Sequence, residues 1–131
     1  MDHQDETVTL ISSEKVAGTN VYNAAGESLG EVDDVMIDKE SGRVAYAVMA
    51  FGGFLGIGEK YHPLPWSSLT YDTDRGGYVV NVSREQLEGA PAFADNAEPQ
   101  WNREYEQRIH DHYGVTPYWG GGVLPPSGLI R

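Results

Sequence analysis

Short runs of alternating apolar and polar residues fill residues 15–82 and predict β-strands. The first two runs, KVAGTNVYN and SLGEVDDVMID, are joined by AAGE, in which Gly26 suits a tight turn. Together they predict a β-hairpin. The alternation of the second run slips at Asp33 and Asp34, where a bulge would absorb one residue.

The next run, RVAYAVMAF at 43–51, is apolar on both faces. This pattern is typical of a central strand covered on both sides, although Ala and Met also favour a helix. The short length and the flanking turns favour the strand. Two further runs surround the turn DTDRGG within 70–82. Five or six short strands joined by turns predict a mainly β fold, a small β-barrel that hides its sheet edges by closing on itself.

Helical periodicity begins only after the predicted barrel. The capping-box spacing that starts at Ser83 predicts one or two helical turns ended by Gly89. Apolar positions at helical spacing within 100–113 predict an amphipathic helix that ends at Gly114. We therefore expect four segments: a flexible N-terminal arm at 1–14, a barrel domain at 15–90, a linker and amphipathic helix with an aromatic end at 91–119, and a flexible tail at 120–131.

Composition narrows the classes of function. The 131 residues carry a net charge of −11, from 20 acidic and 9 basic residues, which disfavours direct binding to the phosphate backbone of nucleic acids. Cysteine is absent, which excludes disulfides, thiol catalysis and cysteine metal sites. No apolar run is long enough to cross a membrane, and the acidic start does not match a secretory leader. We expect a cytoplasmic protein without membrane insertion.

The Gly-rich stretch GGFLGIGEK at 52–60 superficially resembles a phosphate loop. Such a loop needs a Lys followed by Ser or Thr, at the start of a helix. Lys60 is instead followed by Tyr61 and then HPLP, which cannot begin a regular helix. We predict no nucleotide binding here, because the glycines suit a long turn and the prolines suit an edge strand or a bulge.

No group of side chains has the spacing of a catalytic or metal site. His110 and His112 would lie on different faces of a helix and could not easily share one ion. The aspartates around the first hairpin lack the pattern of a calcium loop. His62 has no identifiable partner in the sequence. We predict no catalytic residues, no cofactor and no metal ligands, and therefore no enzyme.

The order of these segments resembles the PRC-barrel domain. NAAGESLGEVDDVMIDKESGRVAYAVMAF is similar to the family's hairpin, turn and apolar strand, and GGFLGIGEKYHPLPWSSL to its Gly-containing loop and PLPW corner. The tail WNREYEQRIHDHYGVTPYW looks similar to those of stand-alone bacterial members. The family also occurs in the photosynthetic reaction-centre H subunit and in a ribosome maturation factor. The resemblance implies a small, strongly bent barrel used for assembly contacts, with no established catalytic residues.

We expect a non-enzymatic protein-interaction or assembly module that associates with itself as a homodimer. An adaptor in RNA processing or ribosome assembly, acting through a protein partner, is the alternative, and a small enzyme or metal-binding protein a more remote one. The C-terminal helix carries more large apolar groups than a solvated tail needs, so it should dock on the same barrel or on a second copy. Trp66 should anchor the barrel edge. The predicted interaction residues are Phe51, Phe54, Leu55, Ile57, Trp66, Trp101, Tyr105, Ile109, Tyr118 and Trp119.

Overall fold

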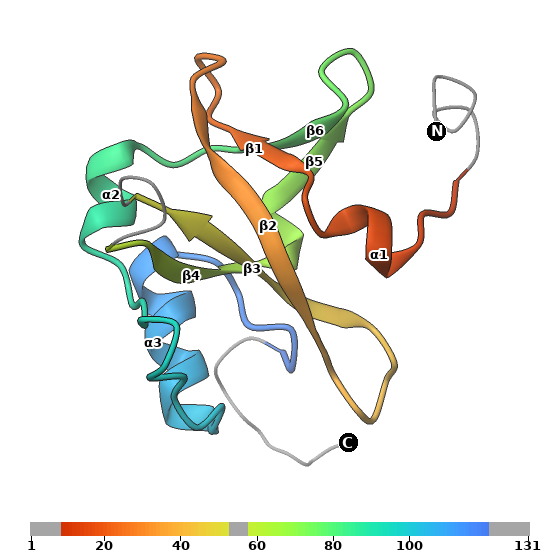
Figure 1. The fold of residues 1–131 in the computed structure, drawn as a ribbon. Helices are drawn as coiled ribbons and strands as arrows, with labels where there is room; N and C mark the ends of the chain where they lie inside the picture. The colour runs from red at the N-terminus through yellow and green to blue at the C-terminus, as the bar shows by residue number, and fades with distance from the viewer. Residues whose placement is uncertain (1–8, 53–57, 121–131) are drawn as a thin grey trace.

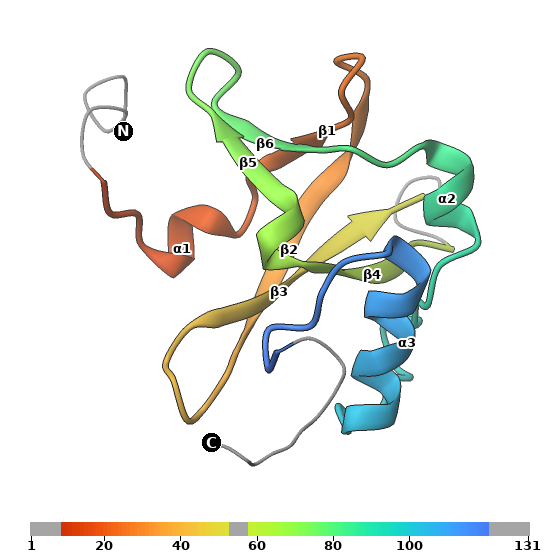
Figure 2. The same cartoon turned by 180° about the vertical axis from the view of Figure 1, so that it is seen from behind.

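The computed structural model describes residues 9–52 and 58–120, which form one curled sheet with helices around it (Figure 1 and Figure 2). The strands are β1 (Asn20–Tyr22), β2 (Ser28–Ile37), β3 (Val44–Phe51), β4 (Lys60–Pro65), β5 (Leu69–Asp72) and β6 (Gly77–Val80). The helices are α1 (Ser13–Val16), α2 (Arg84–Glu88) and α3 (Arg103–Tyr113), with a 3-10 turn at Trp66–Ser68. Within the described residues the strand order is β4-β3-β2-β1-β6-β5. The predicted mainly β, barrel-like fold with a C-terminal helix is confirmed.

The strands β1 and β2 form the predicted antiparallel hairpin, and β2 continues along β3. The register shifts between Val32 and Asp34, which is the predicted bulge. The bulge keeps Val32 buried while Asp33 and Asp34 both stay at the surface. At Gly30 the two strands are so close that an added Cβ would collide with the carbonyl oxygen of Ala50, so this position requires glycine.

The hairpin begins later than the alternation predicted. The first strand was expected from Lys15, but Ser13–Val16 form the short helix α1, and β1 begins only at Asn20. The side chain of Ser12 accepts a hydrogen bond of 3.2 Å from the backbone N–H of Lys15 and caps this helix. Val16 is buried in the main core. A cap and one buried side chain therefore outweigh the weak strand pattern.

The strand β3 is buried on both faces, as its apolar pattern predicts. Every residue from Ala45 to Phe51 is buried. Met49 lies in the main core between the sheet and α2, together with Leu64 of β4. Tyr46 lies in a second core, shared with α3. The strand thus joins the barrel to its C-terminal extension.

The sheet is a curled half barrel with two edge strands. No ladder joins β4 to β5 within the described residues, because the chain leaves β4 through the turn at Trp66–Ser68 and pairs β5 with β6. Pro63 and Pro65 lack a backbone donor, which suits an edge strand. Phe93, in the predicted linker, covers part of this edge through backbone hydrogen bonds of 2.9 and 3.0 Å with Tyr61. The prediction was that the barrel would close and leave no edge strand. In the described residues Phe93 pairs with the exposed edge of β4 instead and so protects it.

The two later helices start and stop where local chemistry predicts. The hydroxyl of Ser83 accepts from the Gln86 N–H at 3.0 Å and caps α2. The side chain of Asn102 accepts from the Tyr105 N–H at 2.9 Å and caps α3. The helix therefore begins at Arg103, whereas the sequence pattern predicted a start at position 100. Gly114 ends α3 with a φ of 67°, in the left-handed region.

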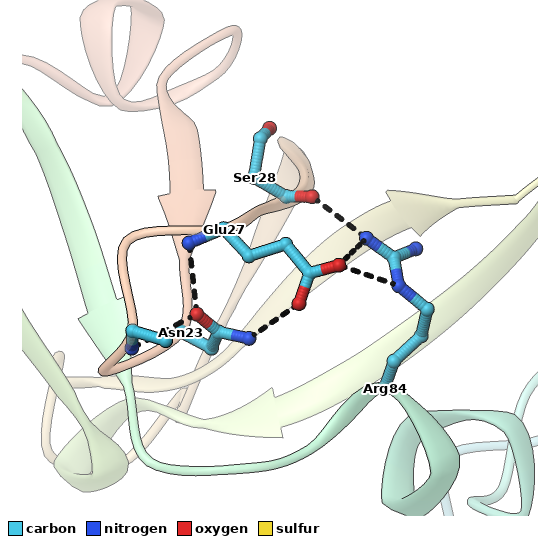
Figure 3. Close-up of polar contacts among 5 residues, drawn as sticks. Asn23, Glu27, Ser28 and Arg84 are labelled. Carbon is cyan, nitrogen blue, oxygen red and sulfur yellow. Dashed lines mark hydrogen bonds and ion pairs between the residues drawn. The ribbon is translucent and has the colours of Figure 1, made fainter.

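A surface network of side chains ties α2 to the β1–β2 hairpin (Figure 3). Arg84 donates from Nε and Nη2 to Oε2 of Glu27, at 3.2 and 3.0 Å, and from Nη2 to the Ser28 carbonyl at 3.1 Å. The Nδ2 group of Asn23 donates to the other carboxylate oxygen of Glu27 at 2.9 Å. Both carboxylate oxygens of Glu27 therefore accept hydrogen bonds within the fold, and the contacts with Arg84 are charge-assisted.

Candidate functional site

The helix α3 docks on the barrel of its own chain (Figure 2). Its predicted apolar stripe is buried, with Tyr105 at 7% and Ile109 at 0% exposure, against Ala45 and Tyr46 of β3. The ring of Trp101 packs beside them, with its centroid 5.9 Å from that of Tyr46. Because an isolated helix of this length is marginal in water, this packing is what orders it.

Of the predicted interaction residues Phe51, Phe54, Leu55 and Ile57, the structure describes only Phe51. Phe51 is part of the main core, where its ring meets the edge of His62 at 5.3 Å between centroids and lies under the guanidinium of Arg84. Phe54, Leu55 and Ile57 lie outside the described residues. Among the described residues, α3 packs on the Tyr46 side of β3 and not on the Phe51 side.

A buried polar network fastens the helix and the segment after it to β3. The hydroxyl of Tyr46 donates to Oε1 of Glu106 at 2.9 Å, and its oxygen lies 2.9 Å from Nε2 of His110. The hydroxyl of Tyr118 donates to the same carboxylate oxygen at 2.6 Å. The remaining ring nitrogen of His110, Nδ1, lies 3.1 Å from the carbonyl oxygen of Val115. One network therefore joins β3, α3 and residues 115–118.

Burial sets the protonation of this network. It raises the pKa of Tyr46, and the hydrogen bond to Glu106 raises it further. Burial and the same carboxylate raise the pKa of Tyr118. Burial lowers the pKa of His110, against the opposing effects of the Val115 carbonyl and of Glu106. Both tyrosines therefore remain hydrogen-bond donors, and the imidazole of His110 is held towards its neutral form.

A cleft of about 940 Å³ lies beside this network. One wall is the β2–β3 turn with the start of β3, at 38–45. The second is the PLPW corner at 65–67. The third consists of Arg103, His110 and the segment 115–119. Figure 2 shows this last segment crossing from the end of α3 towards the β2–β3 turn.

The cleft lining includes three large aromatic rings and two guanidinium groups, beside acidic, aliphatic and small side chains. Trp66 is half-buried against the main core, while Tyr118 is 42% exposed. The guanidinium carbon of Arg103 lies 3.8 Å from the ring centroid of Trp119. Arg43 is exposed on the opposite wall. Of the predicted interaction residues, Trp66, Tyr118 and Trp119 line the cleft. Tyr105 and Ile109 lie in the second core with Tyr46, and Trp101 packs against that core.

Sequence reasoning missed the polar residues of this site. Tyr46 lies within the apolar run 43–51 and Glu106 within the predicted helix at 100–113, but neither residue was proposed for a site. Glu106 and His110 are spaced four apart, which places them on one helix face, and this spacing was the available signal. Arg43 and Arg103 carried no signal, because only folding brings the β2–β3 turn next to the start of α3.

The described residues contain no group of three or more His, Asp or Glu side chains that could hold a metal ion. The Nε2 atom of His112 lies 2.8 Å from the Gln86 carbonyl oxygen, whereas His110 points to Tyr46, so the two histidines diverge as predicted. Lys60 begins strand β4 and not a helix. No helix among the described residues is long and apolar enough to span a membrane.

Comparison with known proteins identifies the barrel. A family model, the PRC-barrel domain, matches residues 9–87. The chain belongs to the PRC-barrel family. The match contains all six strands and most of α2, and it ends before α3. In this PRC-barrel protein the third wall of the cleft therefore comes from outside the matched domain.

One curated protein and one solved structure are similar to this chain. An uncharacterized protein of Deinococcus radiodurans is 24% identical over 93 residues, which cover 70% of this chain and 33% of the relative. The chain thus spans about a third of that relative's length. Among solved structures, the putative 16S ribosomal RNA processing protein RimM of Pseudomonas aeruginosa matches with a TM-score of 0.38 and 17% identity, over 61% of this chain and 48% of RimM.

Proposed function

We propose that this PRC-barrel protein is a non-enzymatic protein-interaction module and that the cleft is its binding surface. The observation that carries the proposal is the docked segment 115–119, which brings Tyr118 and Trp119 to the cleft from outside the family domain. Burying polar groups costs free energy, so a buried network is not expected under a tail that is simply solvated. Here the network holds Tyr118 and Trp119 beside the cleft.

The composition of the cleft supports this role. Trp, Tyr and Arg are the residues that contribute most to binding energy at protein interfaces. The cleft presents Trp66, Trp119, Tyr118, Arg43 and Arg103 together.

The polar network does not support an enzyme. A catalytic acid or base needs an atom that can reach the substrate. The hydroxyl of Tyr46 and both ring nitrogens of His110 already have polar partners inside the protein, and the side chain of His110 is only 3% exposed. The network serves to hold the wall of the cleft in place.

Site-specific photo-crosslinking in the cells that make the protein tests the proposal. Thr116→p-benzoylphenylalanine places the reactive group on the cleft, and Asp74→p-benzoylphenylalanine places it on the β5–β6 turn, far from α3 (Figure 1). We expect a discrete protein adduct from position 116 only. An excess of the unlabelled chain should suppress it, and an excess of the Tyr118→Ser, Trp119→Ser double variant should not. Equal adducts from both positions, or none from position 116, would reject the cleft as the interface.

The homodimer and the adaptor in RNA processing stay predictions. The helical stripe that suggested a second copy is covered within the chain, so a dimer would need another surface. Light scattering of the full-length protein and of a chain truncated after Phe93 tests self-association. A dimer mass for the full-length protein supports the homodimer, and a monomer mass rejects it.

A further inference from the structure

Two guanidinium groups on opposite walls of the cleft have unused hydrogen-bond donors. Arg43 follows the β2–β3 turn, and Arg103 is the first residue of α3. Both side chains are exposed, and neither guanidinium makes a hydrogen bond or an ion pair among residues 9–52 and 58–120. The guanidinium groups of Arg75 and Arg84, in contrast, are paired with Asp72 and Glu27.

Stacking on Trp119 orients Arg103. Its guanidinium carbon lies 3.8 Å from the Trp119 ring centroid and 5.7 Å from that of Tyr118. A guanidinium held on aromatic rings loses little further entropy on binding, and its N–H donors remain available for a carboxylate. The same rings offer an apolar surface next to those donors.

The acidic groups of the cleft do not satisfy these cations. Asp38 accepts from the Ser41 N–H at 3.2 Å within its own turn, and hydrogen bonding to Ser41 lowers its pKa. The charge of Arg103 contributes less to this lowering, and the two side chains form no ion pair within the described residues. The buried carboxylate of Glu106 is held by the hydroxyls of Tyr46 and Tyr118. Glu40 lies exposed on the β2–β3 turn and adds a negative charge at the rim.

We propose that the cleft recognises a segment of a protein partner in which a single aspartate or glutamate is flanked by apolar residues. The carboxylate would accept hydrogen bonds from Arg43 and Arg103, and the flanking residues would pack on Trp66, Tyr118 and Trp119. The net charge of −11 repels strongly acidic segments at a distance, so the segment carries few charges. This inference rests on the cleft being the protein-binding surface.

Nuclear magnetic resonance of the isotope-labelled full-length protein tests the inference. The probe is a pool of capped pentapeptides with Glu at the centre and apolar residues or proline around it, and the matched control pool has Gln at the centre. We expect the Glu pool to shift the Nε–H signals of Arg43 and Arg103, and to bind about tenfold more tightly than the Gln pool, as a charge-assisted hydrogen bond predicts.

Variants assign the effect to the two arginines. Arg43→Gln and Arg103→Gln should each remove the preference for the Glu pool, whereas Arg84→Gln, at a guanidinium already bound by Glu27, should keep it. Unchanged backbone spectra verify that each variant is folded. Equal binding of the two pools, or no shift at either arginine with millimolar peptide, would overturn carboxylate recognition. Crosslinking from position 116 reports separately on the interface itself, so a failure of carboxylate recognition can be distinguished from a failure of the cleft as the interface.

Discussion

At the scale of single residues, the Glu106 carboxylate links segment 115–119 and α3 to strand β3. Glu106 is 8% exposed and receives hydroxyl hydrogen bonds from Tyr46 and Tyr118. A buried carboxyl group is tolerated only where hydrogen-bond partners surround it. The position of segment 115–119 thus depends on donors from two distant parts of the chain.

Replacing Tyr46→Phe should destabilise the protein by about 1 to 3 kcal/mol, since it removes a donor from a buried carboxylate and leaves the ring volume unchanged. The unfolding midpoint in urea measures this loss. Tyr118→Phe is the matched comparison, and it should cost less because Tyr118 is 42% exposed. A midpoint unchanged by Tyr46→Phe would show that the network contributes nothing to folding.

Trp66 belongs to both the barrel and the cleft. Its ring packs on the main core and meets Tyr78 at 5.4 Å between centroids. Trp66→Ala should cost about 3 kcal/mol, at the low end for large aromatic truncations because the side chain is only half-buried. Calorimetric melting measures the effect, with Trp66→Phe as the milder control. An unchanged melting temperature would contradict the anchoring role.

At the scale of elements, the sequence predicted features that depend on neighbouring residues, but it did not predict contacts between segments that are far apart in the chain. The bulge beside Asp33, the cap at Ser83 and the stop at Gly114 each depend on a few neighbouring residues, and all three appear in the structure. The parallel pairing of β1 with β6 had no local signal. The helix stripe was readable from spacing, but its partner, Tyr46, lies in a strand whose two faces look equally apolar.

The cap of α3 offers a test at the same scale. Asn102→Ala removes the hydrogen bond to Tyr105 N–H and should destabilise the helix by about 1 kcal/mol. Hydrogen exchange should then speed up in α3 more than in β2 and β3, because the barrel has its own core. Asn81→Ala is the control, since the Asn81 side chain is exposed and makes no hydrogen bond within the described residues. Equal acceleration in barrel and helix would mean that they unfold as one unit.

At the scale of the whole molecule, buried histidines connect stability to pH. His62 in β4 and His110 in α3 are each 3% exposed, and they lie in different cores. Burial lowers the pKa of both; at His62 the backbone of Leu87 and Lys60 opposes this effect, and the charge of Lys60 adds a smaller lowering. The Nδ1 atom of His62 has no hydrogen-bond partner in the described part of the chain. A proton on this ring would therefore be poorly accommodated in the folded state.

The sign of the pH dependence follows from these lowered pKa values. Above the ordinary histidine value of 6.5, both rings are neutral in the folded and unfolded chains, and their contribution to stability is fully present. As the pH falls below 6.5, the unfolded chain takes up protons first. The free energy of unfolding should then decrease from pH 7 to pH 5, by at most about 1.4 kcal/mol per pH unit for each histidine.

Urea titrations between pH 7.5 and pH 5 measure this decrease. The carboxylates of Glu27 and Asp38, whose pKa values are lowered by hydrogen bonds to Arg84 and Ser41, act only at more acidic pH. His62→Gln and His110→Gln should each flatten the profile, because each removes one proton-binding site that folding disfavours. A profile that is already flat in the unaltered protein, or one that rises towards pH 5, would show that the folded state accommodates the imidazolium form of these rings.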